Sequence, residues 1–349
     1  EISECLVGSE MCIRDSPDAV RFLAKRAGLE VPDDREYAST YKKQERLWAL
    51  CKDAARFFHT QLLAPCGEEA RQYITKRALS RSTVTRFGLG FAPNEWSSLL
   101  DEMVKKGYTK EELLEAGLAV KSQKGGIYDR FRNRLMFPII DVRGNIIGFG
   151  GRVMDDSTPK YLNSPETIIF NKRKNLFALN IAKKSKQGRI ILTEGYMDAI
   201  ALHQYGFDCA VASLGTSLTE EHANLLAKYT NQIVLIYDGD EAGQNATRRA
   251  IPMLEKVGLQ VKILRMQGAK DPDEFLRKFG ADRFSLLLDQ SENQVEYRLQ
   301  SLRRKYDLTQ DDQRVAFLSD AAEMISTLQS AVERLSLIHI SEPTRHSLI

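Results

Sequence analysis

Long apolar runs, paired cysteines and a signal-like N-terminus are all missing from this sequence. No apolar stretch approaches the roughly 20 residues that a membrane-spanning helix needs, and the N-terminus lacks the basic-then-apolar order of a secretory signal. The five cysteines are scattered without a Cys-x-x-Cys pair, so they build neither a zinc ribbon nor a disulfide framework. We therefore expect a cytoplasmic protein with no membrane partner and no zinc site in this chain.

The two ends of the chain look foreign to the rest. Residues 6–16 (LVGSEMCIRDS) can be encoded by a DNA whose reverse complement, read one frame over, gives LSLIHISEPTR, the sequence of residues 335–345. Such a match is typical of a sequencing-library adapter inserted in opposite orientations. We therefore expect residues 1–16 and 335–349 to be adapter-derived and leave them out of the fold prediction.

Charge gives only a weak indication of function. The whole chain has a formal net charge of +3, and a basic excess remains when the two ends are left out. This surplus permits a polyanionic partner without demanding one, because it is often no more than a solvated surface. No strip of basic residues interleaved with aromatic residues marks a sequence-reading surface. Any binding to nucleic acid should therefore be weak, backbone-directed and salt-sensitive.

Hydrophobic periodicity divides the rest of the chain into four parts. A remnant helix ends in a Pro-Asp-Asp break, and the polar stretch at residues 36–44 suits a linker. A mixed α+β subdomain follows, with helices first and then a hairpin-like pair of apolar runs. An alternating strand–helix region and a helical segment complete the chain. The predicted parts are residues 17–43, 44–187, 188–284 and 285–334.

The alternating region predicts an α/β fold, with a parallel sheet covered by helices on both faces. Short, nearly continuous apolar runs alternate with amphipathic helices, and parallel sheets buried on both faces read in this way. Ser217 and Glu220 have the spacing of a capping box at the start of one of these helices. The predicted strands are RIILTE (189–194), CAVASL (209–214), QIVLIYD (232–238) and VKILRM (261–266).

Acidic residues follow three of these strands. In an open parallel sheet, ligands bind beyond the carboxyl ends of the strands, so the acids should converge there. Clusters of oxygen ligands suit hard cations, above all magnesium, and two such ions would activate an attacking hydroxyl and stabilise a leaving pyrophosphate. Each acid taken singly could equally cap a helix or form a turn that leads into one. The acids are Glu194, Asp238, Asp240, Asp271 and Asp273.

The five acids lie in three short motifs, EGYMD (194–198), YDGD (237–240) and DPD (271–273). Together these motifs resemble the Toprim signature of bacterial DnaG-type primases. The resemblance extends beyond this region, covers about residues 17–334 and keeps the family's order. Its other motifs are YDRFR (128–132), MFPI (136–139), GFGGR (148–152), PKYLNSPET (159–167) and ASLGT (212–216).

The resemblance implies an enzyme that copies a single-stranded DNA template into a short RNA primer from ribonucleoside triphosphates. The reaction is nucleotidyl transfer with Mg²⁺ or Mn²⁺ as cofactor, as two or more ions. Glu194, Asp238 and Asp240 would be catalytic, and all five acids would hold metal. The family's replicative helicase and single-strand-binding protein would bind through regions outside this chain, and the protein would work beside the nucleoid.

The resemblance also implies a face that binds nucleotide and DNA. Arg152 follows Gly150 and Gly151, where a bare backbone could approach a phosphate, although the same sequence suits a glycine-rich β-bend. Arg77 could instead be a solvated helix residue, and Lys172 part of an exposed turn. The implied residues are Arg77, Arg152, Lys160, Asn163, Lys172 and Asp198.

Two other classes of function stay open from the residues. Topoisomerases and small nucleases share the Glu and Asp-x-Asp core, but a topoisomerase needs a nucleophilic tyrosine, and Tyr196 and Tyr237 are accounted for by the primase-like motifs. A non-catalytic clamp-loading or helicase-binding module would use the sheet only as a scaffold. The intact set of acids argues against that module.

Overall fold

The computed structural model describes residues 35–123, 125–237, 241–266, 268–293 and 305–326, with Arg26, Leu299, Leu302 and Arg303. The chain divides into two compact units, Glu1–Asp289 and Gln290–Ile349. The second unit contains β11 (Glu292–Asn293) and α14 (Asp311–Ser326). No helix among the described residues is long and apolar enough to span a membrane.

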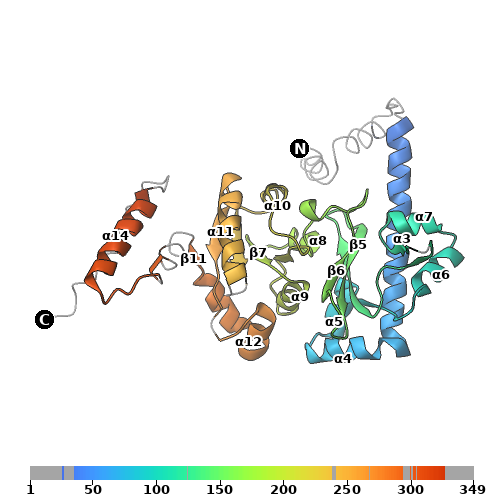
Figure 1. Cartoon of the computed structure of the whole chain (residues 1–349), viewed down its shortest axis with the longest axis horizontal. Coiled ribbons are helices and arrows are strands. Elements are labelled where there is room, and N and C mark those ends of the chain that lie inside the picture. Colours follow the sequence, from blue (N-terminus) through green and yellow to red (C-terminus); the bar gives the residue numbers. More distant parts are fainter. Residues whose placement is uncertain are drawn as a thin grey trace. The chain divides into compact units, whose positions relative to one another are not determined.

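A long helix, α3 (Arg35–Leu63), comes first in the described chain (Figure 1). The linker predicted at residues 36–44 is wrong, because this stretch is helical. Its polar side chains are used in tertiary contacts that periodicity does not reveal: Lys43 Nζ lies 2.7 Å from Glu115 Oε1 of helix α7 (Lys110–Glu115).

An antiparallel sheet in the order β1-β4-β5-β6 packs beside α3. The predicted hairpin is confirmed: Asp141 Oδ1 accepts hydrogen bonds from the backbone N–H groups of Arg143 and Asn145 at 2.9 and 2.8 Å. Gly144 takes the left-handed conformation that this turn needs (φ +99°). The strands are β1 (Gly90–Ala92), β4 (Arg134–Ile140), β5 (Ile146–Val153) and β6 (Tyr161–Asn163).

The two faces of β4 bury different partners, as the period of two in a strand requires. Met136 belongs to the core that α3 closes, where the rings of Phe58 and Phe149 meet edge to face at 5.4 Å. Phe137, on the opposite face, stacks on Tyr196 at 5.2 Å. The antiparallel sheet is thus the layer between α3 and α9 (Tyr196–Gln204) (Figure 1). One hydrophobic core continues across residue 188, which explains why both regions belong to one compact unit.

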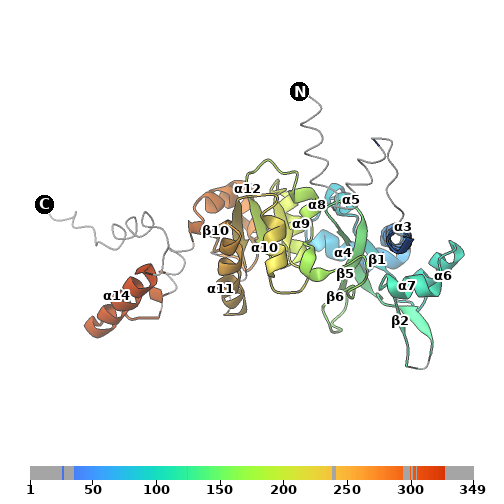
Figure 2. The ribbon, with the colours of Figure 1, turned by 90° about the horizontal axis from the view of Figure 1, so that it is seen from above.

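The second half of the first unit has the predicted α/β fold. Parallel strands stand in the order β10-β9-β7-β8. Helices α9 and α12 cover one face, and α10 and α11 cover the other (Figure 2). The elements are β7 (Ile190–Thr193), β8 (Ala210–Ala212), α10 (Glu220–Leu226), β9 (Gln232–Ile236), α11 (Glu241–Lys256), β10 (Gln260–Ile263) and α12 (Pro272–Asp289).

The capping box at the start of α10 differs from the predicted one. Thr219 Oγ1 accepts from the backbone N–H of His222 at 3.2 Å, and His222 Nδ1 accepts from the N–H of Thr219 at 3.3 Å. The prediction of Ser217 and Glu220 is wrong because the helix begins at Glu220, which makes Thr219 its N-cap.

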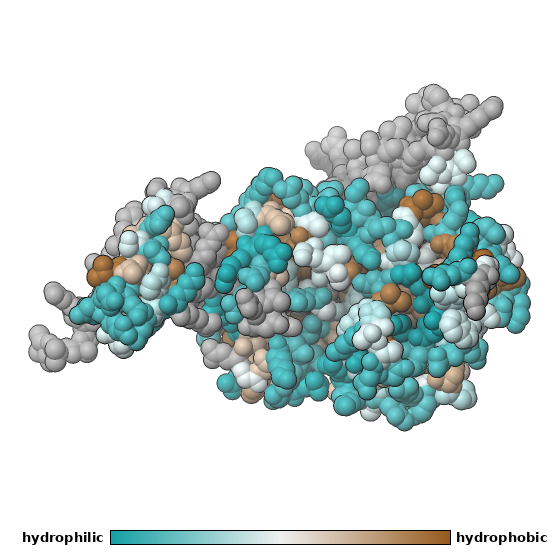
Figure 3. Space-filling model, in the orientation of Figure 1, coloured by the Kyte–Doolittle hydropathy of each residue, from teal (hydrophilic) through white to brown (hydrophobic). Residues whose placement is uncertain are grey.

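Several short elements complete the first unit. On the face of this unit that Figure 3 shows, most side chains are hydrophilic, and the hydrophobic areas are small and separate. Part of the helical segment predicted at residues 285–334 lies outside the described residues. The short elements are η1 (Pro65–Gly67), α4 (Glu68–Lys76), α5 (Arg81–Phe87), α6 (Ser98–Lys105), β2 (Ala119–Lys121), β3 (Ile127–Asp129), η2 (Lys172–Lys174) and α8 (Leu179–Ala182).

Candidate active site

The parallel sheet brings the first of the predicted acids to one edge. Thr193, the last residue of β7, pairs in parallel with Ile236, the last residue of β9, so Glu194 and Tyr237 leave the sheet at the same edge. The side chain of Glu194 is exposed. Burial raises the pKa of Tyr237, and the negative charge of Glu194 raises it further, so the two groups lie close together.

Asp238 and Asp240 follow Tyr237 in the sequence but lie outside the described residues. Among the described residues, no group of three or more histidine, cysteine or acidic side chains is arranged to hold a metal ion. The metal site therefore stays a prediction. Among its described members, Glu194 has the exposure and the strand-end position that the site needs.

Asp198 lies beside Glu194. Helix α9 begins directly after Gly195, and the carboxylate of Asp198, in the first turn, folds back over this glycine. A Cβ atom at Gly195 would stand 2.7 Å from Asp198 Oδ2. A side chain at this position would therefore displace the carboxylate of Asp198.

The two acids at the start of α12 have protein partners. Asp271 Oδ1 accepts from the backbone N–H of Glu274 at 2.7 Å, so it caps the helix, which agrees with the alternative of a turn leading into a helix. Asp273 is only 1% exposed. Its Oδ2 accepts hydrogen bonds from Arg77, the residue that follows α4, and, at 3.2 Å, from Arg277 of α12. Metal binding by Asp271 and Asp273 stays a prediction, and these contacts support structural roles for both.

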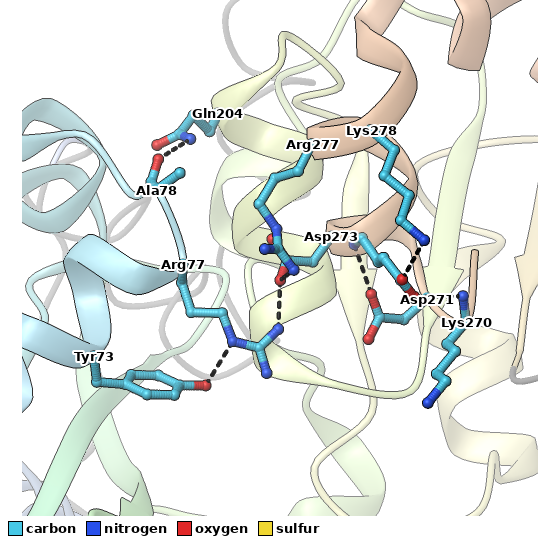
Figure 4. A network of polar contacts seen from close by, with 10 residues as sticks. Tyr73, Arg77, Ala78, Gln204, Lys270, Asp271, Asp273, Arg277 and Lys278 are labelled. Atoms are coloured by element: carbon cyan, nitrogen blue, oxygen red, sulfur yellow. Dashed lines mark hydrogen bonds and ion pairs between the residues drawn. The ribbon is translucent and has the colours of Figure 1, made fainter. Parts of the chain in front are cut away.

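Arg77 is held on two sides, so it is not a solvated helix residue. Its Nε donates to the Tyr73 hydroxyl at 3.0 Å, and its Nη1 donates to Asp273 (Figure 4). Burial lowers the pKa of Arg77, but the hydrogen bond with Asp273 and the nearby negative charge outweigh it, and the net pKa is raised. Arg77 is therefore a fixed, permanent cation.

A second contact joins the same two regions beside Arg77. The side chain of Gln204, at the end of α9, donates to the carbonyl of Ala78 at 2.9 Å and accepts from the N–H of Ser80 at 2.7 Å (Figure 4). We call the contacts of Arg77, Asp273, Arg277 and Gln204 the brace. It attaches the α4–α5 region to the helices α9 and α12, and nothing in the local sequence pattern predicts it.

Arg152 lies next to Arg77 on the ring of Tyr73. Its guanidinium carbon stands 4.1 Å from the centroid of that ring, and that of Arg77 stands 5.5 Å from it. Both cations therefore share one aromatic ring. The sequence analysis missed Tyr73 because an aromatic residue on an amphipathic helix gives no signal of such a role.

The glycines before Arg152 are explained by packing rather than by a phosphate. A Cβ atom at Gly150 would lie 2.7 Å from the ring of Tyr196, and one at Gly151 would lie 3.0 Å from Arg134 and Phe131 side chains. The expectation that this backbone is bare for a phosphate is wrong, because side chains already cover it. The alternative of a β-bend is also wrong, since these residues form the regular strand β5.

The other residues implied to bind nucleotide and DNA lie in different parts of the fold. Lys160 is exposed next to β6. Asn163 accepts from the Tyr196 hydroxyl and donates to the carbonyl of Leu214, both at 2.7 Å, so its amide ties β6 to the parallel-sheet half. The carbonyl of Lys172 lies 2.8 Å from Nε2 of His222, in α10. Lys172 is therefore on the α10 side of the sheet, away from the α12 side where Arg77 lies.

The acids at the start of α9 and the arginines on Tyr73 approach each other around Tyr161. Arg152 and Tyr161 are paired across β5 and β6. The ring of Tyr161 lies 6.2 Å from the ring of Tyr196, the first residue of α9, whose first turn also carries Asp198. The basic face therefore reaches the acid-bearing start of α9.

Comparisons with protein families match three segments of the chain. Residues 57–183 match the DNA primase catalytic core, N-terminal domain; residues 191–276 match a Toprim-like domain; residues 295–340 match the DnaB-helicase binding domain of primase. The last match corrects the expectation that helicase contact lies wholly outside this chain. Part of that segment lies outside the described residues.

Similar curated proteins are DNA primases. The chain is 43% identical over 330 residues to the DNA primase of Clostridium acetobutylicum, an alignment that covers 94% of this chain and 55% of that protein. It is 39% identical over 329 residues to the DNA primase of Escherichia coli, covering 92% and 56%. The chain thus spans about half the length of the curated relatives it matches.

Solved structures agree in fold and in sequence. A DnaG primase catalytic domain bound to ssDNA is 38% identical, with a TM-score of 0.73 and coverage of 86% of this chain and 98% of that one. The RNA polymerase domain of Mycobacterium tuberculosis primase DnaG, in complex with a double-stranded DNA oligomer with a 6-nucleotide overhang, is 31% identical, with a TM-score of 0.77 and coverage of 84% and 95%. The chain therefore belongs to the DnaG-type DNA primases and contains the catalytic core of that family with its Toprim domain.

Proposed function

We propose that this chain synthesises short RNA primers on a single-stranded DNA template from ribonucleoside triphosphates. The observation that carries the proposal is the meeting of two charged groups in one compact unit. The acids Glu194 and Asp198 lie at the edge of the parallel sheet. From the other half, Arg77 and Arg152 share the ring of Tyr73, and Arg152 pairs across the strands with Tyr161, whose ring lies 6.2 Å from that of Tyr196 at the start of α9. Nucleotidyl transfer needs this combination, because cations bind the polyanionic substrates while carboxylates hold metal ions.

The chain's own residues would share the work in three ways. Arg77 and Arg152, fixed on Tyr73, would bind template or nucleotide phosphates together with Lys160. Asp198 and Asn163 would fix the start of α9 and its contact with β6, beside the reacting groups. Lys172 stays a weaker candidate, because it lies on the α10 side of the sheet.

Magnesium or manganese would be held by Glu194, Asp238 and Asp240, with Asp271 and Asp273 as further candidates. When bound, two or more such ions supply the charge that activates the attacking hydroxyl and stabilises the leaving pyrophosphate. Glu194 fits this role through its exposure at the strand end. Asp273 fits it less well, because the two arginines already occupy its buried carboxylate.

A primer-synthesis assay tests the proposal. The chain is incubated with single-stranded template, labelled ribonucleotides and Mg²⁺, and the RNA products are separated by length. We expect product only when template, ribonucleotides and metal are all present. Cleavage or relaxation of DNA without nucleotide incorporation would show that the chain is a different kind of Toprim enzyme.

We also propose that the enzyme works in the cytoplasm beside the nucleoid, with a single-strand-binding protein as a partner. We further propose that the segment 295–340 contacts the replicative helicase. Val315 and Leu318 on α14 are 66% and 54% exposed, and they lie on one side of the helix because they are three positions apart. Replacing both with Asp should weaken helicase binding in a pull-down without changing primer synthesis. Unchanged helicase binding would remove these two residues from the contact.

A further inference from the structure

Tyr73 contacts both Arg77 and Arg152, the two arginines that we call the basic face. Its hydroxyl accepts from Nε of Arg77 at 3.0 Å, and its ring lies 4.1 Å from the guanidinium carbon of Arg152 (Figure 4 shows the first contact). No motif of the sequence includes it. The two arginines come from different parts of the fold: Arg77 follows α4, and Arg152 lies in β5. Their relative position therefore depends on the side chain that contacts both of them.

The charges around Tyr73 do not cancel. Both guanidinium groups lie within 5.5 Å of one ring centroid, and the buried carboxylate of Asp273 pairs with Arg77 and Arg277. Each arginine has a further partner: Arg77 pairs with Asp273, and Nη1 of Arg152 donates to the carbonyl of Val153 at 3.0 Å. Tyr73 is the contact that the two arginines share, through a hydrogen bond to one and a cation–π contact to the other, and this contact opposes their mutual repulsion.

We propose that Tyr73 is a positioning residue for template binding: its hydroxyl orients Arg77 and its ring orients Arg152, so that both cations meet the phosphates of one strand. This inference rests on the proposed function of the two arginines. Tyr73 itself need not touch the substrate. Its effect comes from removing, before binding, the side-chain freedom that two long cations would otherwise lose on contact with DNA.

The test is a set of double-mutant cycles in the full chain, read as affinity for a labelled single-stranded oligonucleotide. Tyr73→Phe keeps the ring and loses the hydroxyl, whereas Tyr73→Leu loses both. We expect affinity to fall about 3-fold in Tyr73→Phe and about 10-fold in Tyr73→Leu, as one hydrogen bond and one cation–π contact would give. Tyr108→Phe is the matched control, because its hydroxyl donates to Asp53 at 2.8 Å, away from the site, and its affinity should not change.

The cycles separate positioning from packing. Tyr73→Phe should be non-additive with Arg77→Ala and additive with Arg152→Ala, whereas Tyr73→Leu should be non-additive with both. The template KM of primer synthesis should rise in step with the loss of affinity, while kcat at saturating template stays the same. If Tyr73→Leu does not fold, the cycle of Tyr73→Phe with Arg77→Ala still decides the role of the hydroxyl.

Several outcomes overturn the inference. Affinity equal to that of the unmodified chain in both variants would do so, as would full additivity with both arginines. A fall in kcat and thermal stability without a change in affinity would show that Tyr73 only packs. If neither Arg77→Ala nor Arg152→Ala weakens binding, the assignment of the basic face fails together with this inference. Absence of primer synthesis in the unmodified chain, with these couplings intact, would overturn the proposed function alone.

Discussion

The edge of the parallel sheet and the brace hold charged side chains in opposite ways. At the edge, Glu194 is exposed directly after a buried strand. In the brace, Asp273 is buried and its carboxylate accepts from two arginines. Acids that the resemblance groups together as metal ligands therefore differ in surroundings. An exposed carboxylate at a strand end is available for chemistry, whereas a buried, paired one holds parts of the fold together.

The largest effect that this comparison predicts is at the edge. Replacing Asp238 or Asp240 with Asn should lower primer synthesis by about 10²- to 10³-fold, the range found when one group that stabilises developing charge is removed. The free energy of unfolding should stay unchanged, because these acids are proposed to serve the reaction and not the packing. Synthesis rates and thermal unfolding of the same preparations check both points. Near-normal synthesis in either variant would remove that acid from the metal site.

Unfolding measured over a range of pH tests the contribution of α9, the helix that begins at the sheet edge and ends at Gln204 of the brace. His203, buried in α9 next to Gln204, has its pKa lowered by burial to about 4, from an ordinary value near 6.5. The folded state therefore keeps this ring neutral, and its Nε2 donates to the carbonyl of Ala210 at 2.8 Å. The contribution of the neutral ring to the free energy of unfolding should be fully present above pH 6.5. The free energy of unfolding should decrease as the pH drops from 6.5 toward 4, by at most about 3 kcal/mol.

His203→Gln supplies the control for this titration. Its stability should change less between pH 6.5 and pH 4 than that of the unmodified chain, because glutamine does not titrate there. Chemical unfolding at a series of pH values measures the difference. Parallel pH profiles for the two proteins would show that other groups, and not His203, control acid unfolding.

Asp273 distinguishes the two kinds of acid most directly. Asp273→Asn keeps the shape of the side chain but removes the charge that Arg77 and Arg277 share, so the free energy of unfolding should fall by about 2 kcal/mol. The arginines are partly exposed, and water would replace some of the lost interaction. Synthesis should decrease about 10-fold through weaker template binding, with an unchanged dependence on Mg²⁺ concentration. A large increase in the Mg²⁺ concentration required would instead place Asp273 among the metal ligands.

The sequence predicted the parallel sheet closely, because its strands are short apolar runs that end at polar residues. It also placed Glu194 at a strand end, which β7 confirms. It could not predict the brace, since Arg77 and Asp273 are 196 residues apart and periodicity reports only local structure. The linker error at residues 36–44 has the same cause: the ion pair of Lys43 with Glu115 of α7 joins that part of the helix to a residue far along the chain.

The smallest predicted effect concerns the other half of the brace. Gln204→Ala removes two hydrogen bonds to the backbone at Ala78 and Ser80, so the free energy of unfolding should fall by about 1 kcal/mol. Synthesis should stay within about twofold, because Arg77 keeps Asp273 and Tyr73. Gln72→Ala is the control, since its amide bonds only within α4, to Glu68 at 3.2 Å. If Gln204→Ala impairs synthesis as strongly as Asp273→Asn, the brace acts as one cooperative unit. Its ion pairs would then be no more important than its neutral hydrogen bonds.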